Sequence, residues 1–132
     1  MVLIDRTKGI AASFVDPEQE SGKVSASGET VLHYAAEYWD GGVISKLLEK
    51  GADIEARSIY GETALHFAAY SRNISTLQIL LKKGADVNIR NIIGWTSLHA
   101  AARKQDGFEP SIKAIEMLLE ANSEVDAQTK IG

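Results

Sequence analysis

Apolar side chains recur at helical spacing in three separate segments of the chain. Their positions follow the order i, i+3, i+4 and are Ile44, Leu47, Leu48; Leu77, Leu80, Leu81; and Ile115, Leu118, Leu119. This spacing places three side chains on one face of an α-helix, where they pack on neighbouring elements. A shorter segment precedes each one and carries a pair of alanines, at 35/36, 68/69 and 101/102. We therefore predict three helix pairs, in which the small alanines let adjacent helices approach closely.

The three pairs share a nine-residue motif that begins with glycine. It reads GETVLHYAA from residue 28, GETALHFAA from residue 61 and GWTSLHAAA from residue 94. Each copy holds one threonine and one histidine, which are Thr30 and His33, Thr63 and His66, and Thr96 and His99. The threonine hydroxyl can cap the N–H groups of a first helical turn, and the glycine permits a tight turn before it. The constant period of 33 residues predicts a stack of similar units.

Each second helix is predicted to end at a residue that tolerates the left-handed conformation. These residues are Gly51, Gly84 and Asn122, and asparagine is the usual substitute for glycine at such a position. A related tail surrounds each stop, namely EKGADIEAR over 49–57, KKGADVNIR over 82–90 and EANSEVDAQ over 120–128. We expect the same loop to follow all three helix pairs.

The motif T-x-L-H-x-A-A, joined to a G-A-D-V-N tail, resembles the ankyrin repeat family over roughly residues 27–132. This resemblance implies an all-α solenoid of stacked helix-turn-helix units joined by β-hairpin-like loops. The units would span 27–57, 58–90 and 91–128. The family usually has proline after the motif threonine, whereas this chain has Val31, Ala64 and Ser97. That departure should weaken helix initiation slightly, because proline suits the first helical position.

Three stretches fall outside the regular pattern. Residues 1–26 are expected to form either a degenerate cap or a disordered segment. Five residues are inserted near 105–111, which reads as a loop that either serves the working surface or has no role. Residues 129–132 match the start of a truncated fourth repeat. We expect the chain to be part of a longer array, or to self-associate through an uncapped C-terminal end.

Composition and charge exclude several classes of function. The chain has 14 basic and 18 acidic side chains, a net charge of -4, which disfavours a non-specific nucleic-acid binder. It has no cysteine and therefore no thiolate metal site or disulfide. No apolar run approaches the roughly 20 residues needed to cross a bilayer. We expect a cytoplasmic protein, with the nucleus as an alternative, that binds neither nucleic acid nor membrane.

The histidines are the first candidates for chemistry, and their spacing argues against it. Adjacent packed helices lie about 8 to 10 Å apart, whereas zinc needs each nitrogen at about 2 Å. Equivalent histidines therefore cannot share a metal, and no serine or aspartate recurs in a position that would orient them. We expect each ring to hydrogen-bond to backbone and threonine groups of its turn. No catalytic residue, metal site, cofactor or small-molecule substrate is predicted, so the chain is not expected to be an enzyme.

The resemblance implies a partner protein, still unidentified, bound in the concave groove formed by the hairpin tips and the first helices. The family's contact positions carry over to Tyr38, Ile59, Tyr60, Glu62, Tyr70, Arg90, Ile92, Ile93, Trp95, Arg103 and Lys104. Aromatic, isoleucine and arginine side chains are typical of protein-binding surfaces. We expect Trp95 to be exposed beside the cationic positions, where it would suit an aromatic or aliphatic anchor with acidic neighbours.

Three alternatives remain open. Some of the tip residues (Ile59, Tyr60, Ile92, Ile93) could instead pack on adjacent hairpins. The whole segment could be a structural spacer in a larger ankyrin-containing protein, contacting that protein's own catalytic or channel domain. Leu80 and the sequence Asp86-Val87-Asn88 resemble an asparagine-hydroxylation pattern, although Asn88 could simply bond the turn backbone.

Overall fold

The computed structural model describes residues 28–104, 107 and 109–131, with only the backbone described over 123–131. These residues form α3 (Val31–Tyr38), α4 (Gly41–Glu49), α5 (Ala64–Ser71), α6 (Ile74–Lys82), α7 (Ser97–Ala102) and α8 (Ile112–Ile131). No β-strand occurs within the described ranges. The predicted all-α architecture is therefore confirmed, and the prediction for residues 1–26 lies outside the described residues. None of the described helices is long and apolar enough to cross a membrane.

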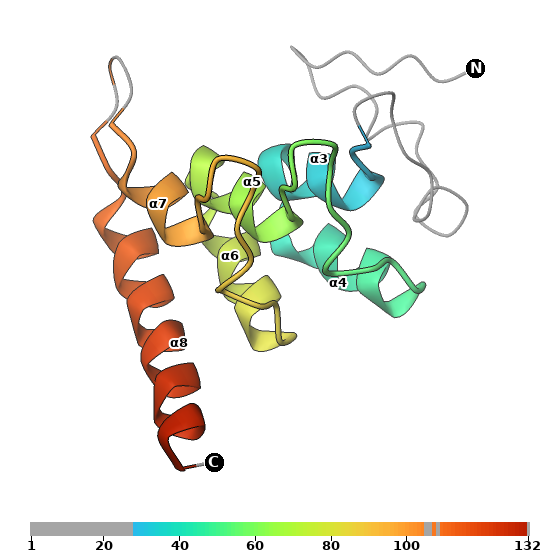
Figure 1. Ribbon diagram of the computed structural model, residues 1–132. Coiled ribbons are helices and arrows are strands. Elements are labelled where there is room, and N and C mark those ends of the chain that lie inside the picture. Colours follow the sequence, from blue (N-terminus) through green and yellow to red (C-terminus); the bar gives the residue numbers. More distant parts are fainter. Residues whose placement is uncertain (1–27, 105–106, 108, 132) are drawn as a thin grey trace, which may run out of the picture.

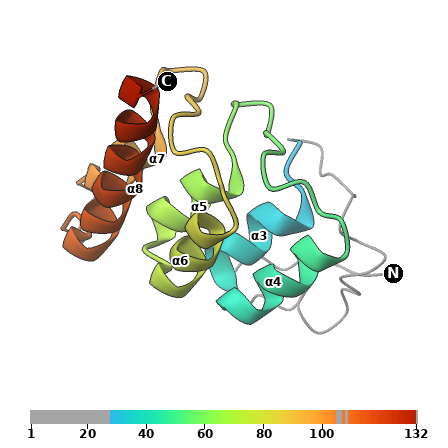
Figure 2. The same ribbon diagram turned by 90° about the horizontal axis from the view of Figure 1, so that it is seen from below.

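The helices stack in two rows. One row holds the first helices, with α5 packed between α3 and α7, and the other holds α4, α6 and α8 (Figure 1). The two helices of each unit also contact one another. The long loops that follow α4 and α6 project from the same side of the stack (Figure 2). This arrangement places the loop tips beside the row of first helices.

The core lies between the rows and is built mainly from the side chains that the apolar pattern identified. Leu119, predicted to pack with them, is 47% exposed on the last helix. Members of the core that are almost fully inaccessible include Leu32, Leu65, Ile44, Leu47, Leu77, Leu80 and Leu118. Ala35, Ala36, Ala68, Ala69, Ala100 and Ala101 are buried where α3, α5 and α7 meet. Small side chains at these positions allow close packing of neighbouring helices. The last helix of the row differs, because Ala102 of the predicted pair is exposed.

The turn before each first helix favours glycine for its backbone conformation, and the first two turns also lack room for a Cβ. Gly28, Gly61 and Gly94 have φ of 78°, 75° and 87°, a conformation that costs an L-residue free energy. A Cβ at Gly28 would also lie 3.0 Å from the backbone nitrogen of Ile59, in the next loop. The threonine two residues later is the N-cap of α3, α5 and α7. The motif therefore builds the helix start and allows adjacent loops to approach closely.

The predicted helix stops are correct at two positions and wrong at the third. Gly51 and Gly84 have φ of 97° and 90°, and their N–H groups donate to Leu48 O and Leu81 O at 3.1 Å. α8 instead continues through Asn122 to Ile131, so the third predicted tail, 120–128, is helical. Asparagine enters the left-handed conformation at a greater cost than glycine, which favours continuation of the helix.

Hydrogen bonds between units join the first two tails. The N–H of Asp86 donates to Glu55 Oε2 at 2.9 Å, and Arg57 Nη2 donates to Arg90 O at 2.5 Å. These bonds tie the first tail to the second. Residues 129–131 form the last turn of α8. The repeat boundaries, including a truncated fourth repeat over 129–132, stay predictions.

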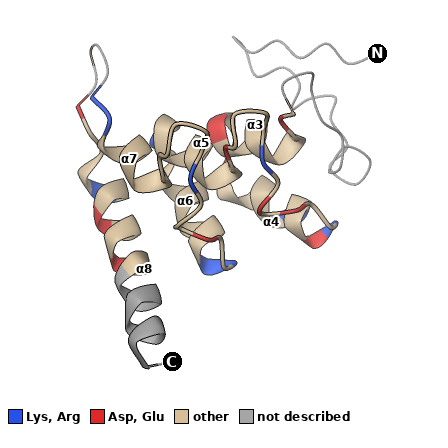
Figure 3. Cartoon of the chain, viewed as in Figure 1, with Lys and Arg blue, Asp and Glu red and all other residues tan. Residues whose placement is uncertain are grey.

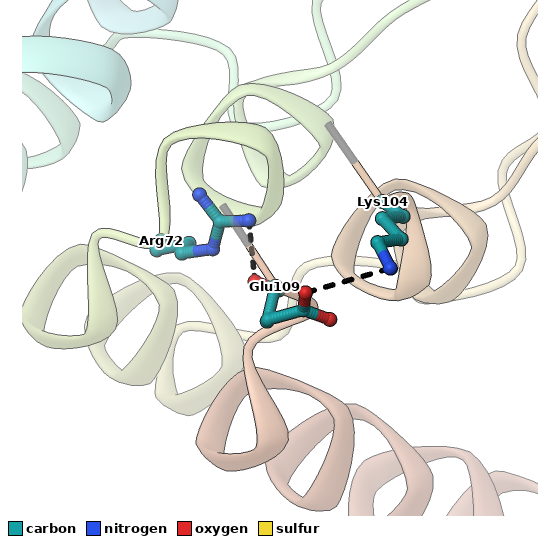
Figure 4. A network of polar contacts seen from close by, with 3 residues as sticks. All are labelled: Arg72, Lys104 and Glu109. Carbon is teal, nitrogen blue, oxygen red and sulfur yellow. Dashed lines mark hydrogen bonds and ion pairs between the residues drawn. The ribbon is translucent and has the colours of Figure 1, made fainter. Parts of the chain in front are cut away.

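The helices of the third unit are joined by a longer connection than those of the second. Arg72 and Asn73 alone separate α5 from α6, whereas residues 103–111 separate α7 from α8. Figure 4 shows how this connection is held: Arg72 Nη2 donates to Glu109 O at 2.6 Å, and Lys104 Nζ lies 3.5 Å from Glu109 Oε1. The region of the predicted insertion therefore contacts the α5–α6 turn of the preceding unit.

Candidate functional site

Two buried histidines connect each unit to the loop of the next. The backbone N–H of Thr30 donates to His33 Nδ1 at 2.9 Å, so the ring proton resides on Nε2. Nε2 then donates to Glu62 O at 2.8 Å, one unit further along the chain. His66 repeats this arrangement with the N–H of Thr63 at 3.1 Å and with Trp95 O at 2.9 Å. Both histidines therefore fix the backbone of a loop tip in the groove.

Burial of both rings also determines their protonation. It lowers the pKa of His33 and His66, and this effect outweighs the hydrogen bonds and nearby carboxylates that favour the charged form. The neutral ring is required because Nδ1 acts as an acceptor. Among the described residues, no group of three or more His, Cys, Asp or Glu side chains could hold a metal ion. The histidines thus contribute positioning of the tips.

The third motif has the same turn in a different environment. The N–H of Thr96 donates to His99 Nδ1 at 3.1 Å, but the His99 side chain is exposed. The ring of Trp95 stacks on that of His99, with centroids 6.2 Å apart and planes at 18°. Trp95 is partly buried, not exposed as expected, and its indole stacks on the imidazole.

The predicted apolar residues at the loop tips are accessible. Ile59, Tyr60, Ile92 and Ile93 are 61%, 51%, 68% and 66% exposed. The N–H of Ile92 donates to Tyr60 O at 2.9 Å, which brings the two tips side by side. Each side chain is more than half exposed, and the alternative that some of them pack on adjacent hairpins stays a prediction. They form an apolar ridge, by which we mean these four residues.

Two polar side chains hold the ridge in shape, and the sequence analysis missed the first of them. Asn91 is 8% exposed, and its Oδ1 accepts from the N–H groups of Ile93 at 3.1 Å and Trp95 at 2.9 Å. The signal was available, because Asn91 stands 33 residues after Ser58, another turn-forming residue. Arg90, a predicted contact residue, donates from Nη1 to Gly94 O at 2.8 Å and so stabilises its own loop.

A recess of about 310 Å³ lies along the row of first helices, and we call it the groove pocket. It is lined by Glu37, Glu62, Phe67, Tyr70, Ser71 and Arg103. The guanidinium carbon of Arg103 lies 5.4 Å from the centroid of the Tyr70 ring, in a cation–π arrangement. Burial, with the Glu62 carboxylate as the next cause, raises the pKa of Tyr70 to about 12. The phenol therefore stays protonated and can donate to a carboxylate.

The groove pocket gathers three of the predicted contact residues and leaves others apart. Glu62, Tyr70 and Arg103 line it, although they come from three different segments of the sequence. Tyr38 is 46% exposed at the end of α3 and does not line it. Lys104 faces solvent and pairs with Glu109. The backbone N–H of exposed Asn88 donates to Asp86 Oδ1 at 2.9 Å, while modification of Asn88 stays a prediction.

Phe67 of the groove pocket was missed by the sequence analysis. It occupies the one position inside the repeated motif L-H-x-A where the three copies differ, with Tyr34 and Ala100 as its equivalents. A variable position inside an otherwise constant motif was the available signal.

Charges of both signs are spread over the described elements and do not gather into one basic face (Figure 3).

A family model described as ankyrin repeats (3 copies) matches residues 6–91 and 58–129. A search of the curated proteins returned no match to this chain.

Proposed function

Because the chain belongs to the ankyrin repeat family, whose members are generally protein–protein interaction modules, we propose that it is a non-catalytic module that binds a partner protein. The partner would occupy the concave surface formed by the apolar ridge and the groove pocket. The observation that carries the proposal is the ridge itself: four large apolar side chains are each more than half exposed, at adjacent tips. Contiguous exposed apolar surface marks interaction sites on soluble proteins.

The rigidity of the surface supports this proposal. The buried rings of His33 and His66 donate to loop carbonyl oxygens, and a backbone hydrogen bond joins the two tips. A surface that is already ordered loses little conformational entropy when it binds, so more of the contact energy appears as affinity. The ridge would supply the apolar contact, and the groove pocket would supply polar selection.

The expectation that the partner carries acidic residues beside its anchor stays a prediction. Arg90 donates to Gly94 O, Arg103 lies over Tyr70, and Lys104 pairs with Glu109. Each of these cations is thus engaged within the chain. The proposed partner contributes an apolar or aromatic anchor to the ridge, and the groove pocket determines which charged side chain it carries beside that anchor.

Selection of peptide ligands from a displayed library tests the proposal. Ligands that bind the wild-type protein should lose at least tenfold in affinity, about 1.4 kcal/mol, when Tyr60→Ala and Ile92→Ala are combined. Both side chains are more than half exposed, so the double variant should fold normally. Gln78→Ala, on the exposed side of α6, is the matched control.

Selected ligands that bind the double variant of Tyr60→Ala and Ile92→Ala as tightly as the wild type would refute binding through the ridge. The spacer alternative predicts a different outcome, in which no ligand depends on the ridge or on Tyr70. The affinities of the selected ligands for the wild type and the variants therefore distinguish a binding module from a spacer.

A further inference from the structure

Two carboxylates from different units face the same recess. Glu37 belongs to α3, and Glu62 lies in the loop that leads into α5, yet both line the groove pocket. The rings of Phe67 and Tyr70 form part of its wall. Carboxylates beside aromatic faces are the groups that bind guanidinium and ammonium ions in proteins.

The Glu62 carboxylate is held in place before any ligand arrives. The carbonyl oxygen of Glu62 accepts from His33 Nε2 at 2.8 Å and from the N–H of Ser58 at 2.9 Å, which fixes its backbone. Asn91 Nδ2 lies 3.5 Å from Glu62 Oε2, and the Tyr70 hydroxyl interacts with the same carboxylate. A carboxylate offers about four lone-pair sites, so these contacts leave acceptor capacity for a cation.

The charge balance of the groove pocket determines which ligand charge it favours. Its lining has two carboxylates and one guanidinium, that of Arg103. An acidic side chain would add a third carboxylate to this set, whereas a basic side chain would make the numbers equal. Arg103 also shows that the Tyr70 ring accepts a guanidinium over its face.

We propose that the groove pocket binds one arginine or lysine side chain of the partner protein, between the carboxylates of Glu37 and Glu62. The inference rests on the proposed function and specifies its chemistry. The cation contacts the two carboxylates, and its aliphatic stem packs on the ring of Phe67. A recess of about 310 Å³ has room for one long side chain. Arg103 repels the incoming cation, so removal of the Arg103 side chain tests which sign of ligand charge the pocket favours.

A titration with defined peptides tests this proposal. The probes are acetylated and amidated pentapeptides, Gly-Gly-Arg-Gly-Gly and Gly-Gly-Glu-Gly-Gly, followed at millimolar concentration by amide NMR of Phe67 and Ser71. We expect saturable shifts with the arginine peptide only. Combining Glu37→Gln and Glu62→Gln should weaken binding at least tenfold, while Arg103→Ala should strengthen it severalfold.

Two controls separate the site from general electrostatics and from misfolding. Glu116→Gln combined with Glu120→Gln removes the same charge from exposed positions of α8 and should leave binding unchanged. Thermal unfolding of every variant verifies that the fold is kept. A loss of affinity in the α8 variant equal to that in the pocket variant would overturn the proposal, because the effect would then follow net charge.

Other outcomes also decide the matter. Saturable binding of the glutamate peptide, or weaker binding after Arg103→Ala, would show that the pocket selects an acidic side chain. Absence of shifts with the arginine peptide would overturn the inference as well. Ligands that still depend on Tyr60 and Ile92 in the library experiment would leave partner binding by the ridge standing in either case.

Discussion

Replacement of His66 by alanine removes both the hydrogen bond within its turn and the hydrogen bond between units. The substitution removes the acceptor of the Thr63 N–H, at 3.1 Å, and the donor to Trp95 O, at 2.9 Å. The carbonyl of Trp95 keeps the N–H of Asn91, at 2.8 Å. The N–H of Thr63, a residue only 1% exposed, loses the imidazole acceptor.

The expected cost follows from these losses. A buried donor left without a partner costs about 1 to 3 kcal/mol, and the lost bond to Trp95 O adds about 1 kcal/mol. Removal of a ring that is 0% exposed adds a cavity term. We expect His66→Ala to lower the free energy of unfolding by about 3 to 4 kcal/mol, which is large for a single substitution.

His99→Ala is the matched control, because it changes the same residue in the same motif. His99 accepts from the N–H of Thr96, yet its side chain is exposed. We expect a cost of about 1 kcal/mol, typical of one hydrogen bond. The difference of about 2 to 3 kcal/mol would then measure burial together with the bond between units.

Urea unfolding followed by circular dichroism provides the measurement. The midpoint should fall much further for His66→Ala than for His99→Ala, with an unchanged slope in both. Equal losses in the two variants, or a loss below about 1 kcal/mol for His66→Ala, would refute the role given to the bond between units.

Three further predictions concern stability. Because burial lowers the pKa of His33 and His66, the unfolded state binds more protons than the folded state below about pH 6.5. The stability that the neutral rings contribute should therefore be complete above that pH and fall with acidification, by at most about 2.7 kcal/mol per pH unit for the pair. Urea midpoints between pH 4 and 8 measure this, and a flat profile contradicts it. Burial raises the pKa of Glu55, so its charged form opposes folding at neutral pH. Glu55→Gln should therefore raise the urea midpoint at pH 7, and the gain should shrink as the pH falls through the raised pKa. A lower midpoint at pH 7 would contradict this. A Cβ at Gly41 would lie 2.8 Å from a side-chain carbon of Ile79 in α6, whereas a Cβ at Gly42 would meet only the side chain of Asp40, the N-cap of α4, at 3.1 Å. Gly41→Ala should lower the thermal midpoint, and Gly42→Ala should lower it less or raise it. The reverse order would contradict the close approach of α4 and α6.

The sequence by itself determined the repeat, the helix pairs and most of their ends. Local rules suffice for these features, because a helix start depends on a cap such as Thr63 and a stop depends on a glycine such as Gly84. The apolar spacing likewise identified Leu77 and Leu80 as core residues, and both are fully buried. A recurring motif strengthens each local signal by repeating it at a constant period.

Only the tertiary structure decided the continuation of α8 past Asn122, the partial burial of Trp95 and the composition of the groove pocket. The first depends on a small difference between a left-handed turn and another helical turn, which contacts with a neighbouring unit can reverse. The second depends on a stacked pair of rings. The pocket unites Glu37, Glu62 and Arg103 from three units, and contacts between residues so far apart in sequence are set by how the units pack.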